Sequence, residues 1–290
     1  MLLRTERLTK VYDGHRALDE LSLEITPGEV FGLLGPNGSG KTTALRLLLG
    51  FLRPTSGRAW ICGHDCWDDG VAARRQVAYL PGELRLYESM TGRQIVRFLC
   101  DLRGQPVAGD LDDLARRFDI DLGRPLAQLS SGMKRKVALL QVLVTQAPLL
   151  IMDEPTNALD PTMRDELLAQ VRRARERGQT VLFSSHVLAE VEQVCDRVAI
   201  LQKGRLVHLQ VMAELREGRL VRARFKGQPE PLPQLEGLHV RERKDNLLVL
   251  EYTESLPELL AWLGRQPLVD LRVEPLGLTA VYHRFHGAEE

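Results

Sequence analysis

Residues 35–43 form a glycine-rich loop whose residue types and spacing suit phosphate binding. They read Gly-Pro-Asn-Gly-Ser-Gly-Lys-Thr-Thr and fit the pattern G-x-x-x-x-G-K-[ST]. The glycines let main-chain N–H groups turn toward an anion, and the positive end of the following helix points to the same place. Lys41 supplies a charge for the β- and γ-phosphates, and the Thr42 hydroxyl can ligate an accompanying Mg²⁺. The expected nucleotide-binding residues are Gly35, Asn37, Gly38, Ser39, Gly40, Lys41, Thr42 and Thr43.

Two adjacent carboxylates supply a second set of chemical groups. Asp153 and Glu154 follow the short apolar run 149–152, which predicts a buried strand. In a protein with this phosphate loop, Asp153 would ligate Mg²⁺ and Glu154 would polarise the water that attacks the γ-phosphate. The alternative is a solvated acidic turn. His186 ends another apolar strand and is either functional or an ordinary structural histidine.

The elements around these residues must bring them to one edge of a sheet. Residues 29–34 are a short apolar run before the loop and residues 44–49 are helix formers after it, so the order is strand, loop and helix. In a doubly wound sheet the carboxyl ends of the strands gather at the ligand. We therefore expect Lys41, Glu154 and His186 to be the catalytic residues. Further strands or hairpins are predicted at residues 3–12, 20–26, 58–62, 76–81, 149–152, 180–185 and 198–209.

A block of helices interrupts the alternation of strands and helices at about residues 83–147. Thr91 and Gln94 form a capping box for one helix, and Asp110 caps a second. A third helix is expected at residues 134–145. We interpret the block as a helical subdomain inserted into the core.

Two features of the first third of the chain are open to more than one interpretation. Tyr12 lies at the bend of a predicted hairpin, where its ring could stack on a base or be an ordinary half-buried strand side chain. Cys62, His64 and Cys66 have the look of a metal cluster. A structural zinc site needs four ligands, and no second pair is spaced to complete one, so we reject it.

Residues 216–290 differ in character from the part before them. Short strands are predicted near 219–225, 238–243, 247–252 and 269–273, with a helix near 256–263 and another at the end. This order predicts a small α+β domain. No set of residues in it suggests chemistry.

Composition limits the classes of partner. The chain has 290 residues, with 39 basic and 39 acidic side chains and no net charge, so no global field favours nucleic acid. The 4 cysteines are too few for a disulfide scaffold and suit a reducing compartment. No apolar run approaches the roughly 20 residues of a membrane helix, and no signal peptide is evident. These observations indicate a soluble cytoplasmic protein.

Taken together, the motifs resemble the ATP-binding subunit of an ABC transporter over residues 2–215. The glycine loop matches the Walker A motif of this family, and residues 149–154 match Walker B. Between them, residues 129–133 read Leu-Ser-Ser-Gly-Met at the place of the family's signature loop, which is specific to it. Tyr12 falls at the adenine-stacking aromatic, residues 157–160 at the D-loop and His186 at the switch histidine.

The resemblance implies a fold and a domain division. The expected fold is α/β: a P-loop NTPase core at 1–215 with an antiparallel β subdomain and a helical subdomain, followed by a small C-terminal α+β accessory domain at 216–290. Two departures stand out. The signature usually reads Leu-Ser-Gly-Gly-Gln, and Gly82 stands where the Q-loop glutamine is usual. Glu83 is the candidate to take over that glutamine's contact with Mg²⁺ or water.

The resemblance also implies partners and cofactors. ATP and Mg²⁺ would bind between two copies, or between this chain and a related ATPase subunit. Ser130, Ser131 and Gly132 of one copy would cap the ATP on the other, and Asp160 would link the two sites. A separate transmembrane permease subunit would dock at residues 83–90, with this chain peripheral on the cytoplasmic face of the membrane. The branch resembled most serves exporters.

Two alternatives remain at this stage. A soluble ABC-family ATPase acting on ribosomes or DNA would need no membrane partner, but such proteins usually carry two nucleotide domains or a long coiled coil. A P-loop kinase needs a second-substrate site and leaves residues 129–133 unexplained.

Overall fold

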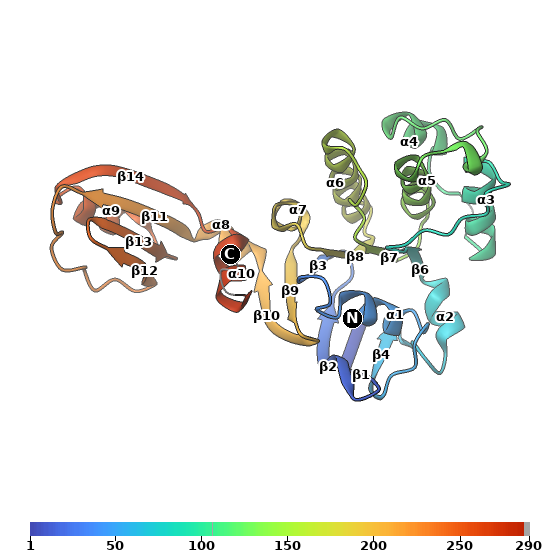
Figure 1. Cartoon of the computed structure of the whole chain (residues 1–290), viewed down its shortest axis with the longest axis horizontal. Coiled ribbons are helices and arrows are strands. Elements are labelled where there is room, and N and C mark those ends of the chain that lie inside the picture. Colours follow the sequence, from blue (N-terminus) through green and yellow to red (C-terminus); the bar gives the residue numbers. More distant parts are fainter. Residues whose placement is uncertain (106, 287–290) are drawn as a thin grey trace. The chain divides into compact units, whose positions relative to one another are not determined.

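The computed structural model describes residues 1–105 and 107–286, which form two compact units (Figure 1). The units are Met1–Gln210 and Val211–Glu290. The division therefore falls earlier than the expected boundary after residue 215. The reason is a short helix that the sequence did not predict, α8 (Met212–Glu217), which contacts β14 (Leu268–Pro275) and so belongs to the second unit.

An antiparallel sheet begins the first unit. Its strand order is β2-β1-β4-β5. The predicted hairpin is present, but its second strand begins at residue 15 rather than 20. Asp13 and Gly14 both have positive φ, at 44° and 83°, as a two-residue hairpin turn requires. The strands are β1 (Leu3–Tyr12), β2 (His15–Ile25), β4 (Ser56–Ile61) and β5 (His64–Asp65).

A six-stranded sheet of order β10-β9-β3-β8-β7-β6 forms the centre of this unit. β3 pairs in parallel with β8 and β9, and β7 pairs in parallel with β6 and β8. Every residue of β3, β7 and β8 is buried, as in a parallel sheet covered on both faces. The carboxyl ends of these three strands therefore meet at one edge. The strands are β3 (Val30–Leu34), β6 (Val77–Leu80), β7 (Leu149–Asp153), β8 (Thr180–Ser185), β9 (Arg197–Gln202) and β10 (Arg205–Val211).

One apolar core joins the two sheets through helix α1 (Lys41–Leu48). Leu45 and Leu48 of this helix belong to the same buried cluster as Ile25 of the antiparallel sheet and Ile151 of the parallel sheet. Each such buried side chain contributes about 1.5–3 kcal/mol to stability. The helix that follows the glycine loop is therefore anchored on both sides.

The predicted helical subdomain stands together at one side of the first unit (Figure 1). Thr91 and Gln94 form the predicted capping box, and Asp110 caps the next helix as predicted. The third helix begins at Ser131, earlier than the predicted residue 134, because the Ser130 hydroxyl accepts a bond from the Met133 N–H. The helices of the unit besides α1 are α2 (Gly70–Arg75), α3 (Gly92–Leu102), α4 (Leu111–Arg117), α5 (Ser131–Leu143), α6 (Pro161–Glu176) and α7 (Leu188–Val194), with a 3₁₀ turn at Leu126–Gln128.

The second unit is a four-stranded antiparallel sheet of order β12-β13-β11-β14. Its core packs strand residues such as Val221 and Leu250 against Leu259 and Leu263 of one helix. The buried Glu251 is bound by arginines from β12 and from the last helix. The remaining elements are β11 (Arg219–Phe225), β12 (Leu238–Lys244), β13 (Leu247–Tyr252), α9 (Leu256–Leu263) and α10 (Leu278–His286), close to the predicted ranges.

Candidate nucleotide site

The glycine loop connects β3 to α1, in the strand, loop and helix order that the sequence predicts. Gly40 has φ 106°, and a Cβ there would lie 2.7 Å from the Ala17 carbonyl oxygen. A Cβ on Gly35 would lie 2.4 Å from Ser39 Oγ. Both positions therefore require glycine. No side chain caps α1, so its first N–H groups remain available for an anion.

A cleft of about 320 Å³ opens over this loop. Ser39 Oγ is buried at the loop and has no hydrogen-bond partner among the described residues. The cleft has room and donors for phosphate groups. It is lined by His15, Ala17, Asn37, Gly38, Ser39, Gly40, Lys41, Thr42, Thr43 and Glu154.

Stacking of an adenine on Tyr12 stays a prediction. Tyr12 does not line the cleft, and its ring lies 4.9 Å from the Lys10 ammonium nitrogen instead. His15, which pairs with Tyr12 across the hairpin, lines the cleft. Sequence reasoning did not identify His15, because which face of the hairpin turns to the cleft depends on how the hairpin packs.

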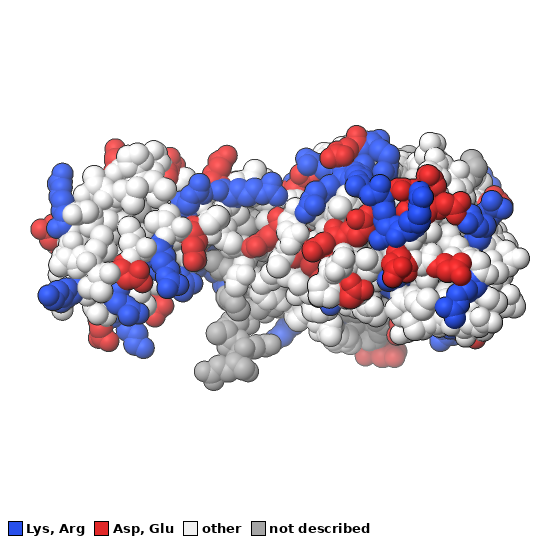
Figure 2. All heavy atoms as spheres, turned by 90° about the horizontal axis from the view of Figure 1, so that it is seen from above, with Lys and Arg blue, Asp and Glu red and all other residues white. Residues whose placement is uncertain are grey.

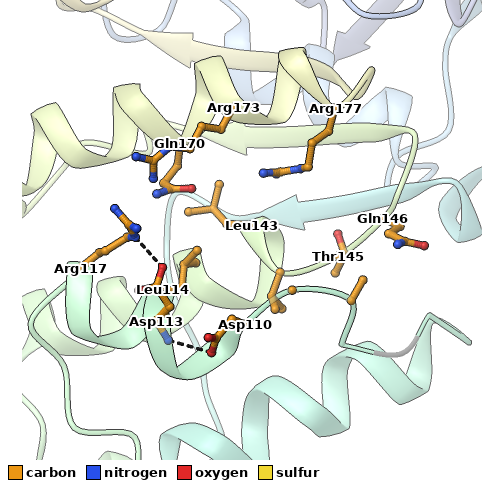
Figure 3. Close-up of a pocket in the computed structure, with 13 residues that line it drawn as sticks. Asp110, Asp113, Leu114, Arg117, Leu143, Thr145, Gln146, Gln170, Arg173 and Arg177 are labelled. Carbon is orange, nitrogen blue, oxygen red and sulfur yellow. Dashed lines mark hydrogen bonds and ion pairs between the residues drawn. The ribbon is translucent and has the colours of Figure 1, made fainter.

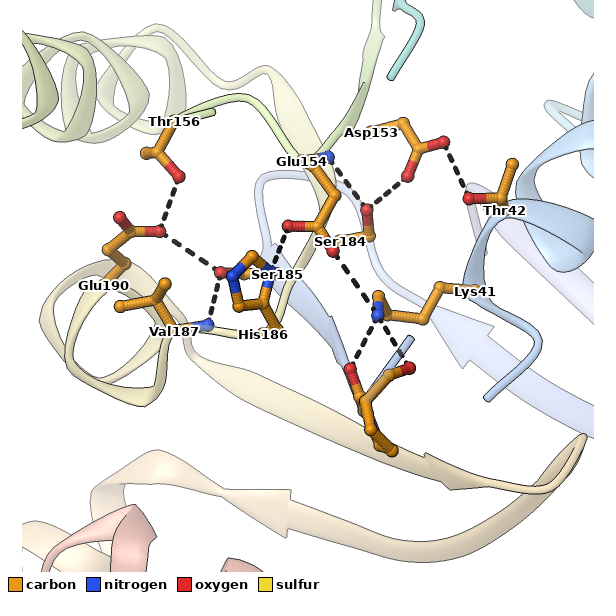
Figure 4. A network of polar contacts seen from close by, with 12 residues as sticks. Lys41, Thr42, Asp153, Glu154, Thr156, Ser184, Ser185, His186, Val187 and Glu190 are labelled. Carbon is orange, nitrogen blue, oxygen red and sulfur yellow. Dashed lines mark hydrogen bonds and ion pairs between the residues drawn. The ribbon is translucent and has the colours of Figure 1, made fainter. Parts of the chain in front are cut away.

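Thr42 and Asp153 meet at the mouth of the loop, although they are far apart in the sequence (Figure 4). The Thr42 hydroxyl donates to Asp153 Oδ2 at 3.0 Å, and the Ser184 hydroxyl donates to Asp153 Oδ1 at 2.6 Å. Hydroxyl and carboxylate oxygens are the ligands that Mg²⁺ takes in phosphate sites. The donor set therefore fits a magnesium ion.

The metal contact expected of Glu83 stays a prediction. The Glu83 side chain is exposed and takes no part in the network around Asp153. Gly82 is the residue that lies against that carboxylate, since a Cβ on it would be 3.2 Å from Asp153 Oδ2. Because residue 82 is a glycine, this position close to the Asp153 carboxylate carries no side chain.

Glu154 connects Lys41 and His186. Its Oε2 lies 2.7 Å from His186 Nδ1, and its Oε1 lies 3.4 Å from Lys41 Nζ. Lys41 Nζ also donates to the carbonyl oxygens of Gly35 at 2.6 Å and Pro36 at 3.2 Å. The structure thus brings the three predicted catalytic residues together (Figure 4).

The main chain at Glu154 is held in an unusual conformation. Its φ is 47°, in the left-handed region that costs a non-glycine residue about 1–3 kcal/mol. The Glu154 N–H donates to Ser184 Oγ at 3.0 Å. Because the same hydroxyl donates to Asp153, Ser184 fixes both carboxylate-bearing residues. Ser184 ends an apolar strand, and that polar ending was the signal available in the sequence.

A buried glutamate supports the segment after β8. Glu190 Oε2 accepts from the hydroxyls of Thr156 at 2.9 Å and Ser185 at 3.2 Å. Ser185 Oγ in turn accepts from the Val187 N–H at 2.9 Å. The peptide on each side of His186 is therefore positioned from α7.

A buried arginine connects α5, the helix that begins in the signature loop and is here called the signature helix, to the site. Arg135 of α5 donates to the carbonyl oxygens of Pro81 at 2.7 Å and Gly82 at 3.0 Å. It also donates to those of Asp153 at 2.8 Å and Glu154 at 2.5 Å. Burial lowers the pKa of its guanidinium below the ordinary value. The sequence offered only a basic run after the signature loop, so this role was missed.

The signature loop stands apart from the cleft. Ser130 and Ser131 are exposed, and neither they nor Gly132 line the cleft above the glycine loop. Asp160 is also exposed and caps α6, its carboxylate accepting from the Met163 N–H at 3.0 Å. One chain therefore assembles the Walker residues but does not bring the signature residues or Asp160 to them.

A second cavity, of about 490 Å³, lies between α4 and α6 (Figure 3). Three of its charged side chains stabilise α4. Arg117 Nε donates to Asp113 at 2.6 Å, and Asp110 caps the helix. None of the nucleotide-site residues lines it. We assign it no function.

Charge is mixed over the surface. Figure 2 shows Lys and Arg interspersed with Asp and Glu on the face that it views, in keeping with the equal totals. Within the described ranges, no helix is both long and apolar enough to cross a bilayer.

Comparison with known proteins identifies close relatives. The family described as ABC transporter matches residues 18–157. The daunorubicin/doxorubicin resistance ATP-binding protein DrrA of Streptomyces peucetius is 35% identical over 74% of this chain and 66% of its own length. The uncharacterized ABC transporter ATP-binding protein YdbJ of Bacillus subtilis is 31% identical over 94% of this chain and 91% of its own. A solved ATP-binding subunit of an ABC transporter matches with TM-score 0.67 and 31% identity, covering 74% of this chain and 92% of that one.

Proposed function

Because the chain belongs to the ATP-binding proteins of the ABC transporter family, which are ATPases, we propose that it powers an exporter through ATP-driven dimerisation. The observation that carries the proposal is the polar network of Lys41, Thr42, Asp153, Glu154 and His186 at the ends of parallel strands. The name of DrrA records drug resistance, which is the result expected of outward transport, so this likeness supports export as the direction.

The positions of these side chains support the following roles in hydrolysis. Thr42 and Asp153 would hold Mg²⁺, which when bound neutralises phosphate charge. Lys41 would leave the loop carbonyls for the γ-phosphate. Glu154 would take a proton from the attacking water, and His186 would keep that carboxylate oriented through its bond of 2.7 Å.

A second chain would complete each site. Ser130, Ser131 and Gly132 lie outside the cleft of their own chain, and Ser130 stands at the N-terminus of the 13-residue helix α5. The positive end of that helix favours a phosphate. We therefore place the signature loop of one copy, or of a related ATPase subunit, over the nucleotide of the other, with Asp160 near the shared contact.

An exposed apolar surface on the helical subdomain suits a membrane subunit. Tyr87 is 62% exposed and Leu102 is 72% exposed, and the Tyr87 ring packs edge-on against Phe98 at 5.8 Å. Contiguous exposed apolar side chains mark interaction sites. Glu88 beside this surface pairs with Lys134 of α5 at 2.7 Å, which would link a docked permease to the signature helix. The chain would then be peripheral on the cytoplasmic face of the membrane.

The test is co-purification with membranes. Leu102→Lys should abolish recovery of the chain with a detergent-solubilised permease while the ATPase rate of the purified chain is unchanged. Val71→Lys is the matched control, since Val71 is 61% exposed on α2, outside this surface. Unchanged recovery of Leu102→Lys, or recovery with ribosomes in place of membranes, would contradict the proposal.

A further inference from the structure

β14 is an edge strand whose outer side has no partner strand among the described residues. It pairs with β11 only, at the end of the sheet (Figure 1). Val269, Leu271 and Val273 are 62%, 37% and 38% exposed. An exposed edge with apolar side chains is a template for pairing with another chain, and proteins usually blunt such edges with charge, proline or short length.

The sequence of this strand is complementary to itself. Residues 269–273 read Val-Asp-Leu-Arg-Val. We propose that β14 pairs antiparallel with β14 of a second copy about a two-fold axis at Leu271. In that register Leu271 faces Leu271, Val269 faces Val273, and Asp270 faces Arg272 twice. An isologous contact requires this kind of symmetry, and the opposite charges indicate a second copy rather than an unrelated strand.

Packing within the second unit agrees with this register. Leu271 lies opposite Ala223 of β11, and Val273 lies opposite Val221, so both point to the face that carries the apolar core. Pairing would extend that core across the two copies. Asp270 and Arg272 point to the other face, where their side chains are 56% and 69% exposed and lie 3.8 Å apart as an ion pair within the chain. In the paired state each would face its opposite charge on the second copy as well.

The ladder would be short. A register shift lies between Arg224 and Phe225 of β11, opposite Val269, and Pro275 cannot donate a main-chain bond. So small a contact is weak alone, but it gains effective concentration wherever two chains already meet. It needs no nucleotide and therefore goes beyond the ATP-driven dimer proposed above.

Disulfide trapping tests the contact in the full-length chain. Residues directly opposite in an antiparallel pair have Cα atoms about 4.5–5.5 Å apart, within the disulfide range. At a protein concentration high enough to populate this weak contact, Leu271→Cys should give a crosslinked dimer under mild oxidation without nucleotide, and equally in a Lys41→Ala background. Val240→Cys, 48% exposed on the opposite edge strand, is the control and should not crosslink. Burial raises the pKa of the native Cys66 thiol to about 12, which keeps it unreactive.

Charge exchange in the Leu271→Cys protein identifies the register. Asp270→Arg or Arg272→Asp alone should reduce crosslinking roughly tenfold, because two symmetric attractions become repulsions. Mixing these two variants, or combining both changes in one chain, should restore it. Crosslinking no greater than that of Val240→Cys, or equal crosslinking in all charge variants, would overturn the proposal. Either result would leave the nucleotide site untouched, since ATP hydrolysis is measured separately.

Discussion

Two parts of the proposed site differ in how far this chain fixes them: the Walker cluster, which is Lys41, Thr42, Asp153, Glu154 and His186, and the signature loop, residues 129–133. Asp153 is buried and takes bonds from Thr42 and Ser184, and Glu154 bridges His186 and Lys41. Ser130 is exposed, and among the described residues its hydroxyl accepts only the capping bond from the Met133 N–H at 3.3 Å. The chain thus fixes the residues for chemistry in advance and presents the signature loop to its surroundings. The difference teaches that folding of one chain assembles only part of the proposed site, and we propose that association supplies the rest.

The largest effect is expected inside the cluster. Glu154→Gln keeps the size of the side chain but removes the base, so kcat for ATP hydrolysis should fall on the order of a thousandfold with ATP binding retained. A phosphate-release assay and nucleotide titration measure both. Glu176→Gln, at the exposed end of α6, is the matched control and should be neutral. Hydrolysis by Glu154→Gln within about tenfold of the parent would mean that another group is the base.

The second largest effect is expected at Arg135, which connects α5 to the strand end that carries Asp153. Arg135→Met leaves the buried carbonyl oxygens of Pro81, Gly82, Asp153 and Glu154 without their donor, which should lower the free energy of unfolding by about 3 kcal/mol. Denaturant unfolding measures this loss.

Lys136→Met, the same change one residue along α5, supplies the control for Arg135→Met and should alter the unfolding free energy little. Equal stability of the two variants would show that the arginine does not hold the strand end.

In the signature loop we expect a small loss of stability and a large loss of dimerisation. Ser130→Ala removes a helix cap and should cost only about 1 kcal/mol of unfolding free energy, yet it should prevent ATP-driven dimerisation. Asp110→Ala removes the cap of α4 and is matched in stability loss. Light scattering with MgATP, with both variants made in a Glu154→Gln, Asp270→Arg background, should separate them. If both dimerise equally, the serine has no role beyond its own helix.

Motifs with local causes were predictable from the sequence. The strand, loop and helix order around Lys41, the caps at Thr91 and Asp110, and the convergence of Asp153, Glu154 and His186 all appear in the structure. Each follows from short-range patterning or from the rule that parallel strand ends meet.

Residues defined by tertiary contact were not predictable. Arg135 belongs to a basic run, and only the packing of α5 shows that its guanidinium is buried. Ser184 and Glu190 likewise acquire their roles from partners distant in the chain. Helix α8 carries no strong periodic signal, and its contact with β14 places it in the second unit.

The most direct measurement is the size in solution of the Glu154→Gln chain with MgATP and with MgADP. An Asp270→Arg background removes the proposed β14 contact, so that any dimer depends on nucleotide. We expect a dimer with MgATP, a single chain with MgADP, and no dimer when Ser130→Glu is added. A Glu154→Gln chain that binds MgATP fully as a single copy would contradict it.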